Sequence, residues 1–299
     1  MPFEEKLYTL AKDRLWKAEP MSRHTTFCIG GPADYYVAPA DAATLCEVVR
    51  LCRREGAPYC VIGNGSNLLC RDAGFHGVII DTTRGLTGCE AAEGGLRAEA
   101  GVLLGSLAKK ALEAGLAGLE FAAGIPGSVG GAMVMNAGAY GGEMGQVAGR
   151  VEVLTGGGEI LTVPAGQMDF SYRHSAVREK GWIVLAASFS LTPGEPEAIR
   201  ERMEELAKRR RQRQPLEYPS AGSAFKRPAE GFAAQLIDEA GLKGLRIGGA
   251  QVSEKHAGFV INRGGATAAD VLRLYTAIQE RVRERTGTCL ELEVEVIGE

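Results

Sequence analysis

The sequence lacks several features that assign a chain to a broad class of proteins. It has no apolar run long enough to cross a bilayer, and its N-terminal residues mix acidic and basic side chains without the apolar core of a signal peptide. Its net charge of −3 over 299 residues argues against general nucleic-acid binding. We therefore expect a cytoplasmic protein of two or three domains that binds neither a membrane nor a nucleic acid.

Metal-binding and nucleotide-binding motifs are missing as well. The seven cysteines form no CxxC pair and the four histidines form no HxxxH or HExxH motif, so we expect mainly buried free thiols and no metal site. No GxxxxGK(S/T) loop occurs. The sequence after residue 62 departs from the GxGxxG motif because Leu68 stands at the third glycine position, which disfavours a Rossmann-type dinucleotide fold.

Glycine is abundant, above all between residues 124 and 142. This run contains seven glycines, and we expect it to form neither a stable helix nor a flexible linker. Glycine lets backbone N–H groups approach a ligand without an intervening Cβ, so the run predicts a cradle for a phosphate-bearing cofactor. Residues 63–67, which follow an expected strand, predict a second cradle, although ordinary tight turns explain them equally well.

Hydrophobic spacing and capping residues predict the order of the elements. Helices are expected at 42–55, 103–115, 195–213, 231–240 and 268–286, and strands at 59–62, 78–81, 151–154, 160–163, 182–191 and 289–297. A glycine-rich hairpin is expected around 88–95. The proline and glycine at 193 and 194 predict a domain boundary.

Three polar clusters are candidates for chemistry, and each has a plainer alternative. Residues 170–175 and 220–228 place small or aromatic side chains beside a cation, which suits a carboxylate clamp but is more typical of a surface loop. The glutamates of 289–297 share one face of the expected strand, which normally indicates exposure to solvent. If that strand lined a cleft, one glutamate would be a rigid carboxylate for acid–base work. Ser223 has no evident activating base, which disfavours a hydrolytic nucleophile.

Six separated blocks resemble the UDP-N-acetylenolpyruvoylglucosamine reductase family, known as MurB. The blocks are RHTTFCIGGPADYYV at 23–37, VIGNGSNLL at 61–69, GIPGSVGGAMVMNAGAYGGE at 124–143, FSYRHS at 170–175, AGSAFKRP at 221–228 and LELEVEVIG at 290–298. They occur in the family's order and spacing over nearly the whole chain. Because no tyrosine-bearing insertion follows Arg227, the chain resembles the shorter of the two MurB types.

The resemblance implies an α+β fold. Its FAD-binding unit is expected to be of the vanillyl-alcohol-oxidase (PCMH) type, with a first subdomain at 1–82 and a second at 83–193. A C-terminal substrate-binding domain is expected at 194–299. The implied activity is the NADPH-dependent, FAD-mediated reduction of UDP-N-acetylglucosamine enolpyruvate to UDP-N-acetylmuramate, a cytoplasmic step of peptidoglycan precursor synthesis, with non-covalent FAD.

The resemblance also implies roles for individual residues. Arg173 is expected at the substrate carboxylate, Glu293 beside it, and Ser223 as the proton donor. The diphosphate of FAD is expected against the two glycine loops, at Gly63, Asn64, Gly65, Ser66, Asn67, Leu68, Gly124, Pro126, Gly127, Ser128, Gly130, Gly131, Asn136, Gly138 and Ala139. Because the uridine diphosphate of this substrate needs cations, contacts are expected at Lys226, Arg227 and Arg213, although Arg213 equally suits the C-terminal end of a helix. Tyr172 is a candidate aromatic side chain to cover the bound sugar nucleotide.

Two other classes of protein stay open. An FAD-dependent oxidase with the same flavin fold would share both glycine loops but would use oxygen. A non-catalytic nucleotide-binding module would bind flavin or nucleotide without turnover of NADPH. The occurrence of Arg173, Ser223 and Glu293 on three separate blocks favours the reductase.

Overall fold

The computed structural model describes all residues from 1 to 299 and consists of two compact units, each assembled from three segments of the chain. Unit 1 comprises Met1–Trp16, Tyr35–Asn64 and Gly77–Arg209, and unit 2 comprises Lys17–Asp34, Gly65–His76 and Arg210–Glu299. The boundaries between the two units fall within four elements, namely β1 (Leu15–Pro20), β2 (Pro32–Val37), β5 (Phe75–Asp81) and α6 (Pro196–Arg213). The division at 82/83 and 193/194 stays a prediction.

The first sheet has the strand order β1-β2-β5-β3 and ends at β3 (Tyr59–Ile62). β3 and β5 are parallel, with Ile62 opposite Asp81. The helix before β3, α2 (Ala42–Glu55), confirms its predicted ends. Asp41 accepts a hydrogen bond from the Thr44 backbone N–H at 2.7 Å, and Gly56 ends the helix with a φ of 66°. Helix α1 (Phe3–Ala11) and the 3-10 turn η1 (Lys12–Arg14) precede β1.

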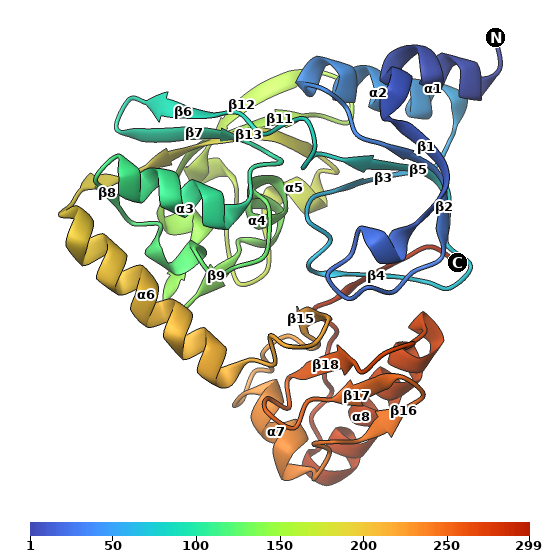
Figure 1. The fold of residues 1–299 in the computed structure, drawn as a ribbon, viewed down its shortest axis with the longest axis vertical. Coiled ribbons are helices and arrows are strands. Elements are labelled where there is room, and N and C mark those ends of the chain that lie inside the picture. The colour runs from blue at the N-terminus through green and yellow to red at the C-terminus, as the bar shows by residue number, and fades with distance from the viewer. The chain divides into compact units, whose positions relative to one another are not determined.

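The second sheet of unit 1 has five antiparallel strands in the order β12-β11-β13-β7-β6. Their bounds are β6 (Cys89–Ala92), β7 (Gly95–Glu99), β11 (Ala148–Leu154), β12 (Ile160–Pro164) and β13 (Ile183–Ser190). These confirm the predicted hairpin around 88–95 and the predicted strands at 151–154, 160–163 and 182–191. Helices α3 (Leu104–Glu113) and α4 (Val129–Met135) pack against this sheet (Figure 1). Shorter elements complete unit 1: β8 (Leu116–Ala117), η3 (Glu120–Ala122), β9 (Gly138–Ala139), β10 (Gly142–Glu143), η4 (Met144–Gln146), η5 (Ala165–Gln167), α5 (Ala176–Glu179) and β14 (Thr192–Pro193).

Helix α4 corrects the expectation that the glycine run contains no helix. Val129, Ala132 and Met133 are buried, so the helix is held by its packing against the core rather than by intrinsic propensity. Gly130 permits this packing, because an added Cβ would lie 3.0 Å from the Cβ of Ala100. The helix ends at Asn136, whose φ of 42° is left-handed.

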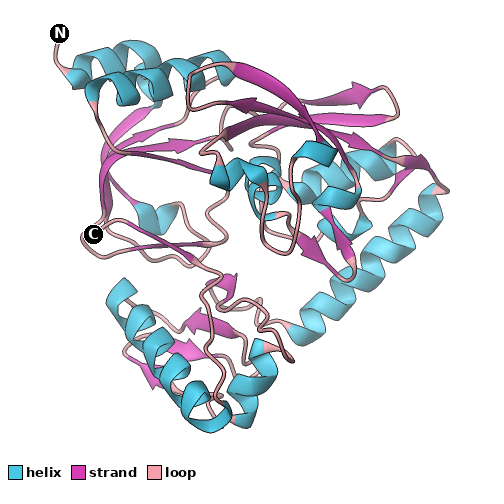
Figure 2. Cartoon of the chain, turned by 180° about the vertical axis from the view of Figure 1, so that it is seen from behind, coloured by secondary structure: helices cyan, strands magenta, loops and turns pink.

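Unit 2 joins the C-terminal residues to the two earlier segments. Its antiparallel sheet has the order β15-β18-β17-β16, and helices α7 and α8 lie beside it (Figure 2). The bounds are η2 (Met21–Arg23), β4 (Leu68–Cys70), β15 (Ser220–Ser223), α7 (Ala233–Glu239), β16 (Arg246–Ile247), β17 (Ala250–Val252), β18 (Phe259–Asn262), α8 (Ala268–Thr286) and β19 (Glu295–Ile297). Phe27, Ile29 and Leu69 share one core with the C-terminal apolar residues. Unit 2 therefore depends on segments that lie far apart in the sequence.

The predicted strand 289–297 is wrong in length. Only β19 is a strand, parallel to β4, while Leu292 forms an isolated bridge with Phe225. The segment changes its pairing partner on the way to β19, which interrupts the expected regular strand. Burial does not follow the expected alternation either, because Glu291 is exposed whereas Glu293 is 9% exposed.

Asp270, in the first turn of α8, is expected to stabilise unit 2 in a pH-dependent way. Its Oδ2 accepts hydrogen bonds from the backbone N–H groups of Gly249 and Thr267, each at 3.2 Å. These bonds, that of Gly249 first, lower the pKa of Asp270 below the ordinary value of 3.8. The resulting stability is present above the pKa of the unfolded chain and is lost as the pH falls through the lower pKa of the folded protein.

We expect Asp270→Asn to lower the free energy of unfolding by about 1 kcal/mol at neutral pH, as loss of a helix-capping contact does. The difference from wild type should shrink as the pH falls below 3.8. Unfolding by denaturant at a series of pH values measures this. A difference that stays constant across the series would contradict the role of the carboxylate.

Candidate active site

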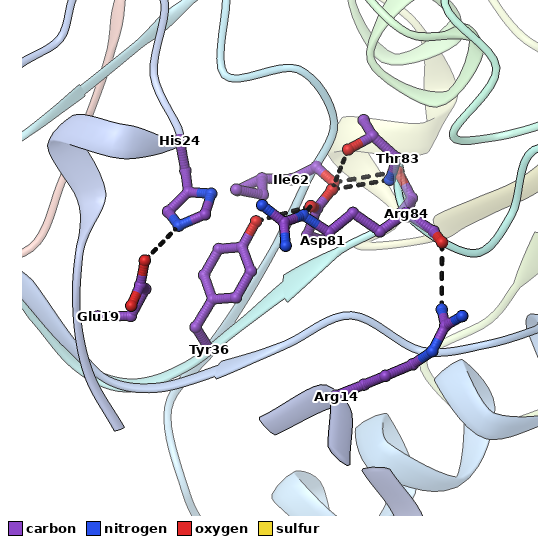
Figure 3. A network of polar contacts seen from close by, with 9 residues as sticks. Arg14, Glu19, His24, Tyr36, Ile62, Asp81, Thr83 and Arg84 are labelled. Atoms are coloured by element: carbon purple, nitrogen blue, oxygen red, sulfur yellow. Dashed lines mark hydrogen bonds and ion pairs between the residues drawn. The ribbon is translucent and has the colours of Figure 1, made fainter. Parts of the chain in front are cut away.

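A buried polar network fixes the end of β3, where the first predicted cradle begins. Thr82 donates hydrogen bonds from its backbone N–H and its Oγ1 to the carbonyl oxygen of Ile62, both at 3.1 Å. Asp81 is 3% exposed and accepts hydrogen bonds from the Tyr36 hydroxyl at 2.6 Å and from the N–H and Oγ1 of Thr83 at 2.7 Å (Figure 3). Residue 63 therefore follows a strand end that side-chain hydrogen bonds fix in addition to those of the sheet.

A cation lies beside the charge of Asp81. The Nε of Arg84 lies 3.7 Å from Asp81 Oδ2, and its guanidinium lies 5.4 Å from the centre of the Trp16 ring. Arg14 donates to the carbonyl oxygen of Arg84 at 3.1 Å (Figure 3). No sequence pattern marks Asp81, because a carboxylate at a strand end is usually exposed and its partner Tyr36 lies 45 residues away in the chain.

The two glycine loops approach each other closely within unit 1. A Cβ added to Gly63 would lie 2.0 Å from the Oγ of Ser128, so this approach requires glycine. Asn64 donates a hydrogen bond from Nδ2 to the carbonyl oxygen of Pro126 at 2.7 Å. Ser128 is 1% exposed, and its Oγ is buried without a hydrogen-bond partner. The Ser128 hydroxyl is thus buried, has no hydrogen-bond partner and lies against a residue without a side chain. This arrangement is expected where a polar ligand completes the hydrogen bonding.

The rest of the first loop belongs to unit 2. The carbonyl oxygen of Gly65 accepts a hydrogen bond from the Thr26 N–H at 3.2 Å, and a Cβ at Gly65 would lie 2.1 Å from the carbonyl oxygen of His24. In the same unit, His24 Nε2 lies 2.9 Å from Glu19 Oε1 (Figure 3). Asn67 donates from Nδ2 to the carbonyl oxygen of Glu293 at 3.0 Å, so this side chain supports the segment that contains Glu293.

Unit 2 brings Ser223 and Glu293 onto neighbouring segments. Ser223 ends β15 opposite Phe259, after Gly222 with a φ of 77°. The carbonyl oxygen of Ala224 accepts a hydrogen bond from the Glu293 N–H at 2.9 Å, and the Lys226 N–H donates to the carbonyl oxygen of Glu291 at the same distance. Backbone pairing thus places Glu293 beside the residue that follows Ser223. Glu293 is nearly buried, so the expectation of a solvated glutamate face fails at this position.

Arg173 lies in a tight turn of unit 1. Ser171 and His174 exchange two backbone hydrogen bonds, at 3.2 and 3.1 Å. Between them, Arg173 adopts a left-handed φ of 56°, and its guanidinium lies 5.1 Å from the centre of the Tyr172 ring. Tyr172 is 48% exposed. The turn therefore presents a half-buried cation and an exposed aromatic ring together.

The other candidate substrate contacts lie at the surface of unit 2. Lys226 Nζ lies 3.4 Å from Glu291 Oε2, and the Arg227 guanidinium lies 4.9 Å from the centre of the Phe232 ring. Arg213 is exposed at the last residue of α6. No group of His, Cys, Asp or Glu side chains is arranged to hold a metal ion. None of the helices is both long enough and apolar enough to pass through a membrane.

Two family models match the chain. Residues 33–164 match the model described as FAD binding domain, and residues 214–297 match the model described as UDP-N-acetylenolpyruvoylglucosamine reductase, C-terminal domain. The expected α+β fold, with an FAD-binding unit followed by a C-terminal domain, is confirmed.

The chain is also similar over its length to proteins named UDP-N-acetylenolpyruvoylglucosamine reductase. The protein from Agathobacter rectalis is 52% identical, and the match covers 95% of this chain and 94% of the relative. The protein from Caldanaerobacter subterraneus is 48% identical over 99% of this chain and 98% of its own length. The crystal structure of the MurB from Thermus caldophilus is 39% identical, with a TM-score of 0.78, and the match covers 93% of this chain and 97% of that chain.

A more distant likeness concerns the fold alone. The crystal structure of Phl p 4, a grass pollen allergen with glucose dehydrogenase activity, matches with a TM-score of 0.50 at 14% identity. The match covers 65% of this chain and 45% of that chain.

Gly63→Ala is expected to weaken FAD binding, because its Cβ would lie 2.0 Å from Ser128 Oγ and must push the two loops apart. Overpacking of this kind costs about 1–3 kcal/mol of folding stability, and if FAD binding must restore the close approach at that cost, the affinity falls by about fivefold to 150-fold. Titration of the apo-protein with FAD, followed by flavin fluorescence, measures the change.

Two further variants control this experiment. Gly166→Ala adds a methyl group where no atom lies within 4 Å and should leave the affinity unchanged. Gly63→Ala combined with Ser128→Gly removes the clash and should recover part of the lost affinity. Equal FAD affinities for Gly63→Ala and wild type would rule out the cradle.

Proposed function

The chain belongs to the UDP-N-acetylenolpyruvoylglucosamine reductase family, and we propose that it reduces UDP-N-acetylglucosamine enolpyruvate to UDP-N-acetylmuramate with NADPH as the co-substrate. The product is a precursor of peptidoglycan. FAD is the cofactor, in agreement with the match of residues 33–164 to an FAD binding domain. The chemistry that FAD supplies when bound is the transfer of a hydride from NADPH to the enolpyruvyl group.

The residues of the two loops fit a bound dinucleotide. The Ser128 hydroxyl lies against Gly63 and is buried without a hydrogen-bond partner. Asn64 connects the two loops through its hydrogen bond to the carbonyl oxygen of Pro126. Gly63, Asn64 and Ser128 would therefore hold the diphosphate part of FAD, with backbone N–H groups of the glycine run beside them.

The pairing of the Ser223 segment with the Glu293 segment is the observation that supports the reductase most directly. It places a hydroxyl and a nearly buried carboxylate on adjacent, hydrogen-bonded backbone segments of one unit. A hydroxyl and a nearly buried carboxylate on paired backbone segments suit a reaction in which a proton is delivered to a carbon that bears developing negative charge.

The chemistry of the substrate indicates where negative charge develops during the reaction. Hydride addition to the terminal carbon of an enol ether that bears a carboxylate leaves negative charge on the carbon beside that carboxylate. We assign Arg173 to this carboxylate, where a fixed cation stabilises the charge most as it develops. Glu293 supplies a second polar group there, through a hydrogen bond or through its charge.

We assign the final proton to Ser223. A serine hydroxyl is a weak acid, but a carbanion beside a carboxylate is a strong base, so no activating partner is required. Lys226 and Arg227, which follow in the same loop, are the candidate contacts of the uridine diphosphate. Arg213 stays a predicted contact of the diphosphate on the same basis, and Tyr172 stays a predicted aromatic contact of the sugar nucleotide.

An FAD-dependent oxidase is the second candidate, because it would share the cradle. Such an oxidase does not require a serine at the end of β15 whose following residue, Ala224, pairs with a nearly buried glutamate. A non-catalytic nucleotide-binding module would require neither these residues nor Arg173.

An anaerobic experiment distinguishes the three functions. The FAD-loaded protein is bleached with NADPH and then mixed with UDP-N-acetylglucosamine enolpyruvate. Immediate recovery of the oxidised flavin spectrum, with formation of UDP-N-acetylmuramate, is expected. Recovery with air only would indicate the oxidase, and failure to bleach with NADPH would indicate the binding module.

Ser223→Ala is expected to slow the step that follows flavin reduction. A positioned proton donor contributes about a hundredfold to ten-thousandfold, so reoxidation by the enolpyruvyl substrate should slow by that factor. Stopped-flow absorbance should show unchanged flavin reduction by NADPH. Ser220→Ala on the same strand is the control and should behave as wild type. Equal slowing of both half-reactions in Ser223→Ala would refute the assignment.

A further inference from the structure

The side chain of Asn136 joins two other segments of unit 1. Asn136 is 1% exposed and occupies the left-handed position at the end of α4. Its Nδ2 donates a hydrogen bond to the carbonyl oxygen of Ser171 at 3.1 Å, and its Oδ1 accepts one from the Gly145 N–H at 2.8 Å. One buried amide therefore connects the end of α4 to the first residue of the turn that contains Arg173.

Ser175 anchors the other end of the same turn. Its side chain is buried, and its Oγ donates a hydrogen bond to the carbonyl oxygen of Val134 in α4 at 2.9 Å. The Ala176 N–H, next in the chain, donates to the carbonyl oxygen of Met168 at 2.7 Å. Both ends of the turn are thus tied to the last residues of α4.

Arg173 depends on these two anchors for its position. The turn between them is closed by the two Ser171–His174 backbone hydrogen bonds, and its left-handed Arg173 is a conformation that costs free energy for a residue other than glycine. Such a conformation persists when the surrounding contacts determine it. The backbone of the turn that carries Arg173 is therefore tied to the end of α4.

We propose that Asn136 is a positioning residue for Arg173, with Ser175 as its second anchor, rather than a side-chain contact of the cofactor. This inference rests on the proposed function, in which Arg173 stabilises the charge that develops on the substrate. Asn136 acts by fixing the Ser171 carbonyl, and through it the turn that directs the guanidinium. The backbone around Asn136 remains part of the glycine run.

Asn136→Asp tests the hydrogen bond to Ser171 with little change of shape. Aspartate tolerates the left-handed backbone and keeps an oxygen for the Gly145 N–H, but its ionised form cannot donate to the Ser171 carbonyl. Because burial raises the pKa of a carboxyl group, the protonated form is available at lower pH and can donate in place of the amide.

Reoxidation of the reduced flavin by the enolpyruvyl substrate is expected to slow by about a hundredfold in Asn136→Asp, the effect of a misplacement of about 1 Å. The ratio of variant to wild-type rates should rise as the pH falls. Flavin reduction by NADPH and FAD affinity should stay as in wild type. Ser175→Ala should slow the same step without the pH-dependent recovery.

A second buried asparagine provides the matched control. Asn262 in unit 2 donates from Nδ2 to the carbonyl oxygen of Phe27 and accepts from Gly264, so Asn262→Asp makes the same chemical change elsewhere. It should lower stability without the selective loss of reoxidation. Asn136→Asp combined with Arg173→Lys should be little slower than Arg173→Lys alone, because the positioned group is already lost.

Hydrogen exchange at the Ser171 and His174 amides tests the anchoring without substrate. Faster exchange in Asn136→Asp and in Ser175→Ala supports the inference, and wild-type protection in both variants overturns it. A loss of FAD affinity with unchanged exchange would assign Asn136 to the cofactor instead. If wild-type protein is not reoxidised by the enolpyruvyl substrate, the proposed function fails, while the exchange measurement still decides whether Asn136 holds the turn.

Discussion

The lack of a side chain at residue 63 is the steric condition on which the candidate cofactor loops depend. β3 ends at the position where Ser128 begins α4, and any Cβ at Gly63 would overlap the Ser128 hydroxyl. Asn64 adds a hydrogen bond to Pro126 at the same place. The end of α4 then holds Asn136, which connects to the turn of Arg173. The close approach of Gly63 to Ser128 is therefore connected, through α4, to the turn that carries Arg173, the predicted catalytic cation.

Two nearly buried carboxylates have different roles in the molecule. Burying an ionised carboxylate is costly unless hydrogen bonds or opposite charges compensate it. Asp81 receives three hydrogen bonds, from Tyr36 and Thr83, and has Arg84 beside it, so its surroundings account for its burial. Glu293 is held by its backbone to Ala224, the residue that follows Ser223, so it lies on a segment paired with the one that carries the serine. The first carboxylate organises the fold, and the second is suited to chemistry.

The predictions that succeeded depended on residues close together in the chain. Helix α2 begins after Asp41 and ends at Gly56, as the capping chemistry of these residues predicts. Helix α8 begins after Thr267 and ends at Gly287 for the same reason. The predictions that failed concerned segments shaped by packing. Glycine-rich α4 forms because its apolar face is buried. The alternating segment at 289–297 is not one regular strand, because it pairs first with residues 224–226 and then with β4.

The sequence alone determined the family, the fold class and the presence of two glycine loops, because these follow from blocks of residues whose order and local spacing are specific. Only the tertiary structure decided that unit 2 includes residues 17–34 and 65–76, that Glu293 is nearly buried, and that Asn136 supports the Arg173 turn. Each of these rests on contacts between residues far apart in the chain. Local propensity and periodicity do not encode such contacts, which form only when the chain packs and buried polar groups find their partners.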